Sequence, residues 1–367
     1  MLYNYYMPVE YVVLLFSLVL VGFIPFLSRA YIPRLETIAG QPNEIRPKRS
    51  SFFDMLRGVA IIGVVVIHIT YFATPYVSDL APINNLTNNL LRFALPVFFV
   101  SSGVLLVAPK LHLGWLSSFY YRRFVALGIP YILVTIALGL YYSTPISEIW
   151  YNILTGNASV PLYFVPVLFQ LYLLYPFIYN LAQRQWFVWV TLIVSIFSYL
   201  EPTLRFWQDL SYATPYVFFF AWGMYMRTNF QQHRITQPVL PWLAIIAMFV
   251  ALQLYFGVER FYNGQYFYGL AMIMLLWWLY TKELVPTLFS ACSQYIGRRS
   301  LWIFLTHFVW LQLCFYLLHT RDVLFTGAGA VLFVVLGLVG SVTLGIGMYY
   351  LQSLVISYIS NSERAGR

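Results

Sequence analysis

The chain has 367 residues, of which 61% are hydrophobic, 20% are aromatic and only 9% are charged. Soluble domains carry about 25% charged residues, so this composition excludes a water-soluble fold. The net charge of +9 does not require a nucleic-acid partner, and we expect none, because the basic residues gather in particular gaps between apolar segments.

Apolar segments that reach or approach the length of a bilayer span recur along the whole chain. They lie at residues 10–28, 52–73, 92–108, 124–142, 161–182, 185–200, 212–227, 239–257, 265–281, 300–318 and 325–356. The sequence therefore predicts an all-α fold, a polytopic transmembrane helical bundle of about 11 helices. We expect the first segment to be an anchor helix rather than a signal peptide, because no basic residue precedes it in Met1–Pro8.

Basic residues mark one side of the predicted bundle. The gaps after the odd-numbered segments hold most of the lysines and arginines. The alternate gaps hold only Arg205, Arg260 and Arg321, with Arg92 at the edge of one of them. By the positive-inside rule, the N-terminus is expected outside and the C-terminus in the cytoplasm.

The two cysteines, Cys292 and Cys314, fall in a cytoplasmic gap and in a span. We therefore expect no disulfide between them, and their spacing predicts no metal site.

Three ionisable residues, Asp54, Arg57 and His68, lie in the second predicted span. Ionisable residues are costly inside a bilayer and usually mark a functional site. Arg57 and His68 are eleven residues apart, which places them on one helix face, about 16 Å apart along the axis. Asp54 lies one turn before Arg57 on nearly the same stripe. Alternatively, Asp54 and Arg57 could be an ion pair that anchors the helix to lipid, and His68 could be a neutral histidine in the protein core.

Two other features stand out in later spans. His307 is a second imidazole in the middle of a span, and either a structural or a chemical role fits it. Arg122 and Arg123 begin the fourth span. A basic pair at that place either marks the cytoplasmic side or binds the phosphates of a cytosolic ligand.

The run from Asp54 through Arg57 to His68 resembles the arginine–ten residues–histidine signature of the acyltransferase-3 family of integral-membrane acyltransferases. Further matches follow in the family's order, at Pro96–Gly103, Tyr121–Phe124 with Pro130-Tyr131, Leu162–Pro166 with Gln170–Tyr172 and Tyr175-Pro176, and Gly297–His307. The resemblance covers residues 51–355. This sequence differs from the family's pattern at Ala126 and Leu127, where a further arginine is frequent, and at Tyr163, where tryptophan is common.

The resemblance implies how the chain is divided and where it acts. Residues 51–360 would form the acyltransferase-3 transmembrane domain, with the family's ten-helix core. Residues 1–50 would add an N-terminal transmembrane helix and a basic cytoplasmic linker. The expected location is a bacterial inner membrane, where membrane lipid surrounds the bundle.

The resemblance also implies the chemistry. The enzyme would use cytosolic acyl-CoA, expected to be acetyl-CoA, as a co-substrate with no tightly bound cofactor. It would acylate a hydroxyl of a cell-surface polysaccharide or a lipid-linked glycan. His68 would act as a general base or carry the acyl group covalently, and Arg57, oriented by Asp54, would bind the donor. Candidate supporting residues are Arg122 and Arg123 for the donor phosphates, and His307, Ser102, Tyr163 and Tyr172 near the acceptor or behind the catalytic residues.

Two other classes of function remain as alternatives. A proton-coupled transporter could use Arg57, His68 and His307 as a proton path, but the sequence shows no repeated halves and no matching broken-helix pairs, which many secondary transporters have. An inactive scaffold could deliver glycan to another enzyme. Only the acyltransferase would consume an acyl donor.

Overall fold

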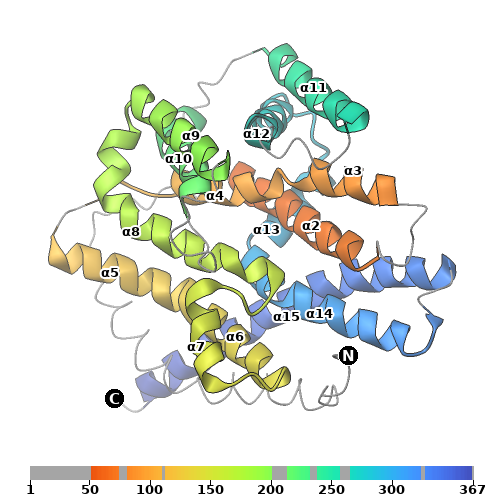
Figure 1. The fold of residues 1–367 in the computed structure, drawn as a ribbon. Helices are drawn as coiled ribbons and strands as arrows, with labels where there is room; N and C mark the ends of the chain where they lie inside the picture. The colour runs from red at the N-terminus through yellow and green to blue at the C-terminus, as the bar shows by residue number, and fades with distance from the viewer. Residues whose placement is uncertain are drawn as a thin grey trace.

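The computed structural model describes residues 51–73, 81–109, 112–200, 213–231, 238–256, 265–323 and 327–365. These residues form helices joined by short turns and contain no β-strand, which confirms the all-α prediction for the described part of the chain (Figure 1). The first predicted span, 10–28, and the basic linker after it lie outside the described residues. The α-helices in chain order are α2 (Ser51–Ala73), α3 (Ala81–Leu91), α4 (Ala94–Val104), α5 (Leu113–Arg123), α6 (Ile129–Tyr141), α7 (Ile146–Thr155), α8 (Phe164–Ala182), α9 (Gln185–Leu200), α10 (Val217–Gln231), α11 (Leu240–Phe256), α12 (Gln265–Thr281), α13 (Thr287–Gly297), α14 (Ser300–His319) and α15 (Gly327–Ala365).

Each predicted span within the described residues coincides with a helix. Five helical stretches are long and apolar enough to cross a membrane: Ser51–Ala73, Leu113–Tyr141, Val160–Ala182, Ser300–His319 and Gly327–Leu354. Three shorter apolar helices match the predicted spans near 185–200, 239–257 and 265–281. The structure thus bears out a helical membrane bundle.

The predicted span at 92–108 is the least regular match. Its helix, α4, covers only Ala94–Val104, and a turn at Arg92 and Phe93 separates it from α3. The chain after α4 leaves the helix before Pro109, because proline cannot continue a helix and disfavours helix at the residue before it.

Four helices lie wholly or mainly outside the predicted spans: α3, α5, α7 and α13. Each is about three turns long and mixes polar with apolar residues, so a search for long apolar runs does not find it. The fourth predicted span begins at 124, whereas the helical stretch begins at Leu113 and passes through a π-helical segment, Phe124–Gly128, into α6.

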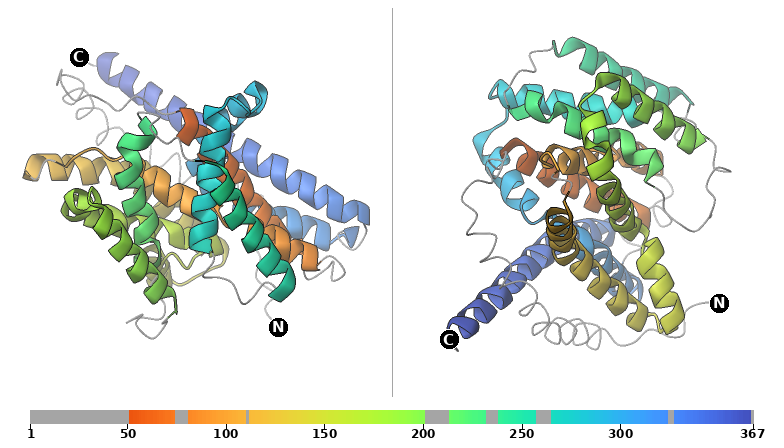
Figure 2. Two further views of the ribbon diagram at one scale, coloured as in Figure 1. Left: turned by 90° about the horizontal axis from the view of Figure 1, so that it is seen from above. Right: turned by 90° about the vertical axis from the view of Figure 1, so that its left-hand side faces the viewer.

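Helix α2 lies in the middle of the described bundle (Figure 1) and contacts α3, α4, α12, α13, α14 and α15. Its buried residues occur on several faces of the helix, as expected for an apolar helix surrounded by protein. By contrast, α15 projects its C-terminal end beyond the other helices (Figure 2) and exposes many apolar side chains, such as Val331, Val335 and Leu354. We expect that surface to face lipid.

Paired glycines allow α13 to pack closely against α2 and α10 to pack closely against α4. A side chain at Gly58 of α2 would overlap the backbone of Ser293, and one at Gly297 of α13 would overlap the carbonyl oxygen of Asp54. The backbones of α2 and α13 can therefore touch only because both residues lack a Cβ. Gly103 of α4 and Gly223 of α10 allow the same close approach between those helices.

Candidate active site

A buried ion-pair cluster joins the start of α2 to the end of α13. The Asp54 carboxylate, whose side chain is 1% exposed, accepts from Arg57 at 2.6 Å and from Arg298 at 3.3 Å. The close glycine contact between the two helices brings Arg298 within reach. A carboxylate removed from water is tolerable when cations pair with it. The Arg57 side chain stays 22% exposed, so its guanidinium is anchored and still accessible.

That accessible side of Arg57 borders a cavity of about 200 Å³, which we call the arginine cavity. Its polar lining consists of Arg57, Arg123, Ser101, Ser102, Ser300 and Tyr172, and the remaining lining is apolar. The Arg123 guanidinium lies over the Tyr172 ring, 4.7 Å from its centroid. The buried Ser101 hydroxyl has no hydrogen-bond partner among the described residues. Two guanidiniums and spare hydroxyl groups suit a ligand that carries phosphates and amides.

Arg122 has a different place. It does not line the arginine cavity, and its Nε donates to the backbone carbonyl of Ser118 in the preceding turn. Of the basic pair that begins the predicted fourth span, the structure therefore brings Arg123, and not Arg122, to the cavity that Arg57 lines.

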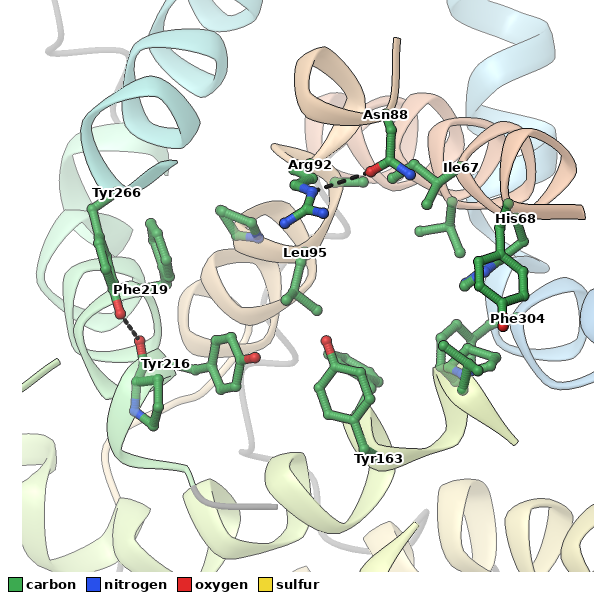
Figure 3. Close-up of a pocket in the computed structure, with 18 residues that line it drawn as sticks. Ile67, His68, Asn88, Arg92, Leu95, Tyr163, Tyr216, Phe219, Tyr266 and Phe304 are labelled. Atoms are coloured by element: carbon green, nitrogen blue, oxygen red, sulfur yellow. Dashed lines mark hydrogen bonds between the residues drawn. The ribbon is translucent and has the colours of Figure 1, made fainter. Parts of the chain in front are cut away.

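A second cavity of about 390 Å³, the histidine cavity, lies against the other half of α2. Figure 3 shows His68, Arg92, Tyr163 and Tyr216 around its open space, with the Tyr163 hydroxyl directed into that space. The Nε of Arg92 donates to Asn88 at 3.1 Å. Aromatic rings with a few polar groups at their edges are typical of binding sites for small polar ligands.

His68 and His307 form a pair, with ring centroids 5.2 Å apart and planes tilted by 37°. His68 is 9% exposed and lines the histidine cavity, whereas His307 is 0% exposed and is not part of that lining. The Nδ1 of His307 lies 2.7 Å from the Phe304 carbonyl oxygen, so this nitrogen must carry the proton and donate. His68 is thus the imidazole that a ligand can reach. The His307 ring packs against His68 and does not line the cavity.

The structure groups the predicted site residues around two cavities. Asp54, Arg57, Arg123, Ser102 and Tyr172 gather at the arginine cavity, and His68 and Tyr163, backed by His307, gather at the histidine cavity.

Sequence reasoning missed four contributors: Arg298, Phe164, Phe304 and Arg92. The first three belong to the segments quoted for the family resemblance. Their place in these segments could have pointed to them as site residues. No sequence pattern, however, showed which residues they contact.

A known protein family matches most of the chain. The acyltransferase-3 family model, described as an acyltransferase domain, matches residues 50–350, which include every residue of both cavities and of the ion-pair cluster. No curated protein and no solved structure matches the chain.

Proposed function

We propose, from the premise that this chain belongs to the acyltransferase-3 family, that it moves an acetyl group from cytosolic acetyl-CoA to a hydroxyl of a cell-surface polysaccharide or lipid-linked glycan. Family membership makes the protein a membrane O-acyltransferase. The donor, the acceptor and a bacterial inner membrane as its location are our proposals.

The observation that carries the proposal is the placement of Arg57 and His68 along α2. Arg57 lines a cavity with a second guanidinium, and His68 lines a separate cavity on the same helix. The distance along the helix between the two residues, about 16 Å, is comparable to an extended pantetheine arm. A donor with its phosphates near Arg57 and Arg123 would therefore point its thioester toward His68.

In the proposed reaction, an imidazole nitrogen of His68 removes the proton from the acceptor hydroxyl. The hydroxyl oxygen attacks the thioester carbonyl carbon and forms the new ester bond as the carbon–sulfur bond breaks. The thiolate of CoA leaves and takes up a proton, and His68 returns to its neutral form. Arg57 and Arg123 bind the donor, and Asp54 with Arg298 fixes the Arg57 guanidinium.

Transfer through a covalent acyl-His68 would use the same cavities in two steps. Intact-mass measurement of the protein after incubation with acetyl-CoA alone separates the two routes. Direct transfer leaves the mass unchanged, whereas the covalent route adds one acetyl group, and His68→Ala abolishes that addition.

The function is tested by incubating the purified protein in lipid with radiolabelled acetyl-CoA and glycans extracted from the source membrane. We expect label to pass into an ester-linked glycan that dilute alkali releases. A transporter or an inactive scaffold would leave the donor unconsumed, and monodisperse protein that consumes no acyl-CoA would refute the proposal. Mass spectrometry of surface glycans with and without this protein identifies the acceptor.

A further inference from the structure

The arginine cavity and the histidine cavity meet at two phenylalanine side chains. Phe164, at the start of α8, and Phe304, in α14, line both cavities and are the only described residues that do so. Their ring centroids lie 5.3 Å apart with planes at 62°, and both residues are buried. We call them the phenylalanine pair. Its two rings form a wall at the place where the cavity of Arg57 adjoins the cavity of His68.

Neighbouring residues hold this wall in place from both sides. The Phe164 ring packs against Phe99 and Phe98 of α4, at centroid distances of 4.9 and 5.8 Å. The Phe304 ring lies 5.9 Å from the His307 ring, and the Phe304 carbonyl oxygen accepts from His307 Nδ1. Phe304 of the wall and His307 of the histidine pair therefore lie on the same turn of α14.

We propose that the phenylalanine pair determines acyl-chain specificity and restricts the transferred group to a short chain. The proposal rests on the proposed function, in which a thioester from the arginine cavity brings its carbonyl carbon toward His68. The acyl chain attached to that carbon then lies against the two rings. An acetyl methyl group needs little space there, whereas each added methylene requires volume that a ring occupies in a close-packed interior.

The two rings also occupy space next to the thioester that water would otherwise fill. Without a ring, water could attack the thioester carbonyl carbon, and the carbon–sulfur bond would break to give acetate and the free thiol of CoA. Exclusion of water from a reactive centre is one way in which enzymes prevent such side reactions. Loss of the wall should therefore raise donor hydrolysis in the absence of acceptor.

The test compares transfer from acetyl-CoA, propionyl-CoA and butyryl-CoA by purified wild-type protein, Phe304→Ala and Phe164→Ala in lipid. Pockets discriminate one methylene by about 10- to 200-fold, so we expect the butyryl-to-acetyl ratio of kcat/KM to rise at least about tenfold in both variants. Phe304→Leu and Phe164→Leu keep more volume and should give smaller changes in the same direction. They preserve the test if an alanine variant does not fold.

Two buried phenylalanines that line neither cavity provide matched controls. Phe249 of α11 and Phe333 of α15 are both buried, and neither lines the arginine cavity or the histidine cavity. Phe249→Ala and Phe333→Ala should keep the wild-type butyryl-to-acetyl ratio and the low hydrolysis of donor alone.

Each outcome of the comparison has a distinct meaning. If wild-type protein transfers acetyl but the variants of the phenylalanine pair keep the wild-type ratio, or the controls change it equally, this inference is wrong and the proposed function stands. If monodisperse wild-type protein consumes no acyl-CoA, the proposed function is wrong and the inference is wrong with it.

Discussion

At the scale of single residues, the ionisable groups of α2 differ in what surrounds them. Asp54 is buried and pairs with two arginines. Arg57, one of the two, also lines the arginine cavity. His68 lines the histidine cavity and packs against His307. A lipid-anchoring ion pair would not need a buried carboxylate with two partners. The surroundings therefore favour a site that binds ligands from two directions.

Arg123 and Arg122 provide a matched pair for testing donor binding. Arg123→Ala removes a guanidinium from the arginine cavity, so we expect the KM for acetyl-CoA to rise about 10-fold, as for the loss of a charge-assisted contact, with kcat changed less. Arg122→Ala should keep the wild-type KM because Arg122 does not line the cavity. Steady-state kinetics with varied acetyl-CoA measures both, and equal effects of the two substitutions would argue against a donor role for the arginine cavity.

His307 is expected to act through His68 rather than on substrate. His307→Ala should lower kcat by less than His68→Ala does, with donor affinity unchanged. His307→Asn should recover much of the rate, because its amide can donate to the same carbonyl that Nδ1 reaches. A loss as deep as that of His68→Ala, without recovery by asparagine, would mean that both imidazoles move protons.

At the scale of helices, the contact between α2 and α13 sets the ion-pair cluster. Gly297→Ala would force the α13 backbone away from the Asp54 carbonyl and carry Arg298 with it. Overpacking of this kind costs about 1–3 kcal/mol. We therefore expect a lower midpoint of thermal unfolding and a raised KM for the donor.

Gly347→Ala is the control for that substitution, because a Cβ at Gly347 of α15 has nothing within 4 Å. It should leave both thermal stability and KM near their wild-type values. Wild-type behaviour of Gly297→Ala would show that α2 and α13 do not approach as closely as described.

The helices also show how far sequence reasoning extends. The predicted spans coincide with helices because long apolar runs are visible in the sequence, and the shared stripe of Arg57 and His68 follows from helical periodicity alone. Helices α3, α5, α7 and α13 were missed because they are short and partly polar. The partners Arg298, Phe164 and Phe304 depend on which helices touch, and contacts between distant segments leave no local pattern.

At the scale of the whole molecule, a cytosolic donor can bind in the arginine cavity only if that cavity faces the cytoplasm. Cys292 is exposed and Cys314 is buried, so labelling by a thiol reagent reports on Cys292. In sealed cells, an impermeant reagent should leave Cys292 unlabelled and should label a cysteine introduced by Asn157→Cys. Labelling of Cys292 from outside, with Asn157→Cys protected, would reverse the orientation of the bundle and place the donor cavity on the wrong side.

The most direct test of the central claim is acetyl transfer and acetyl-CoA binding by monodisperse His68→Ala protein in lipid. If His68 is the general base, the variant should fold and bind donor as the wild type does, yet transfer acetyl about 10²–10⁴-fold more slowly. Arg57→Ala should lose donor affinity as well as rate, because its guanidinium lines the arginine cavity. A folded His68→Ala protein that transfers acetyl at the wild-type rate would contradict the account.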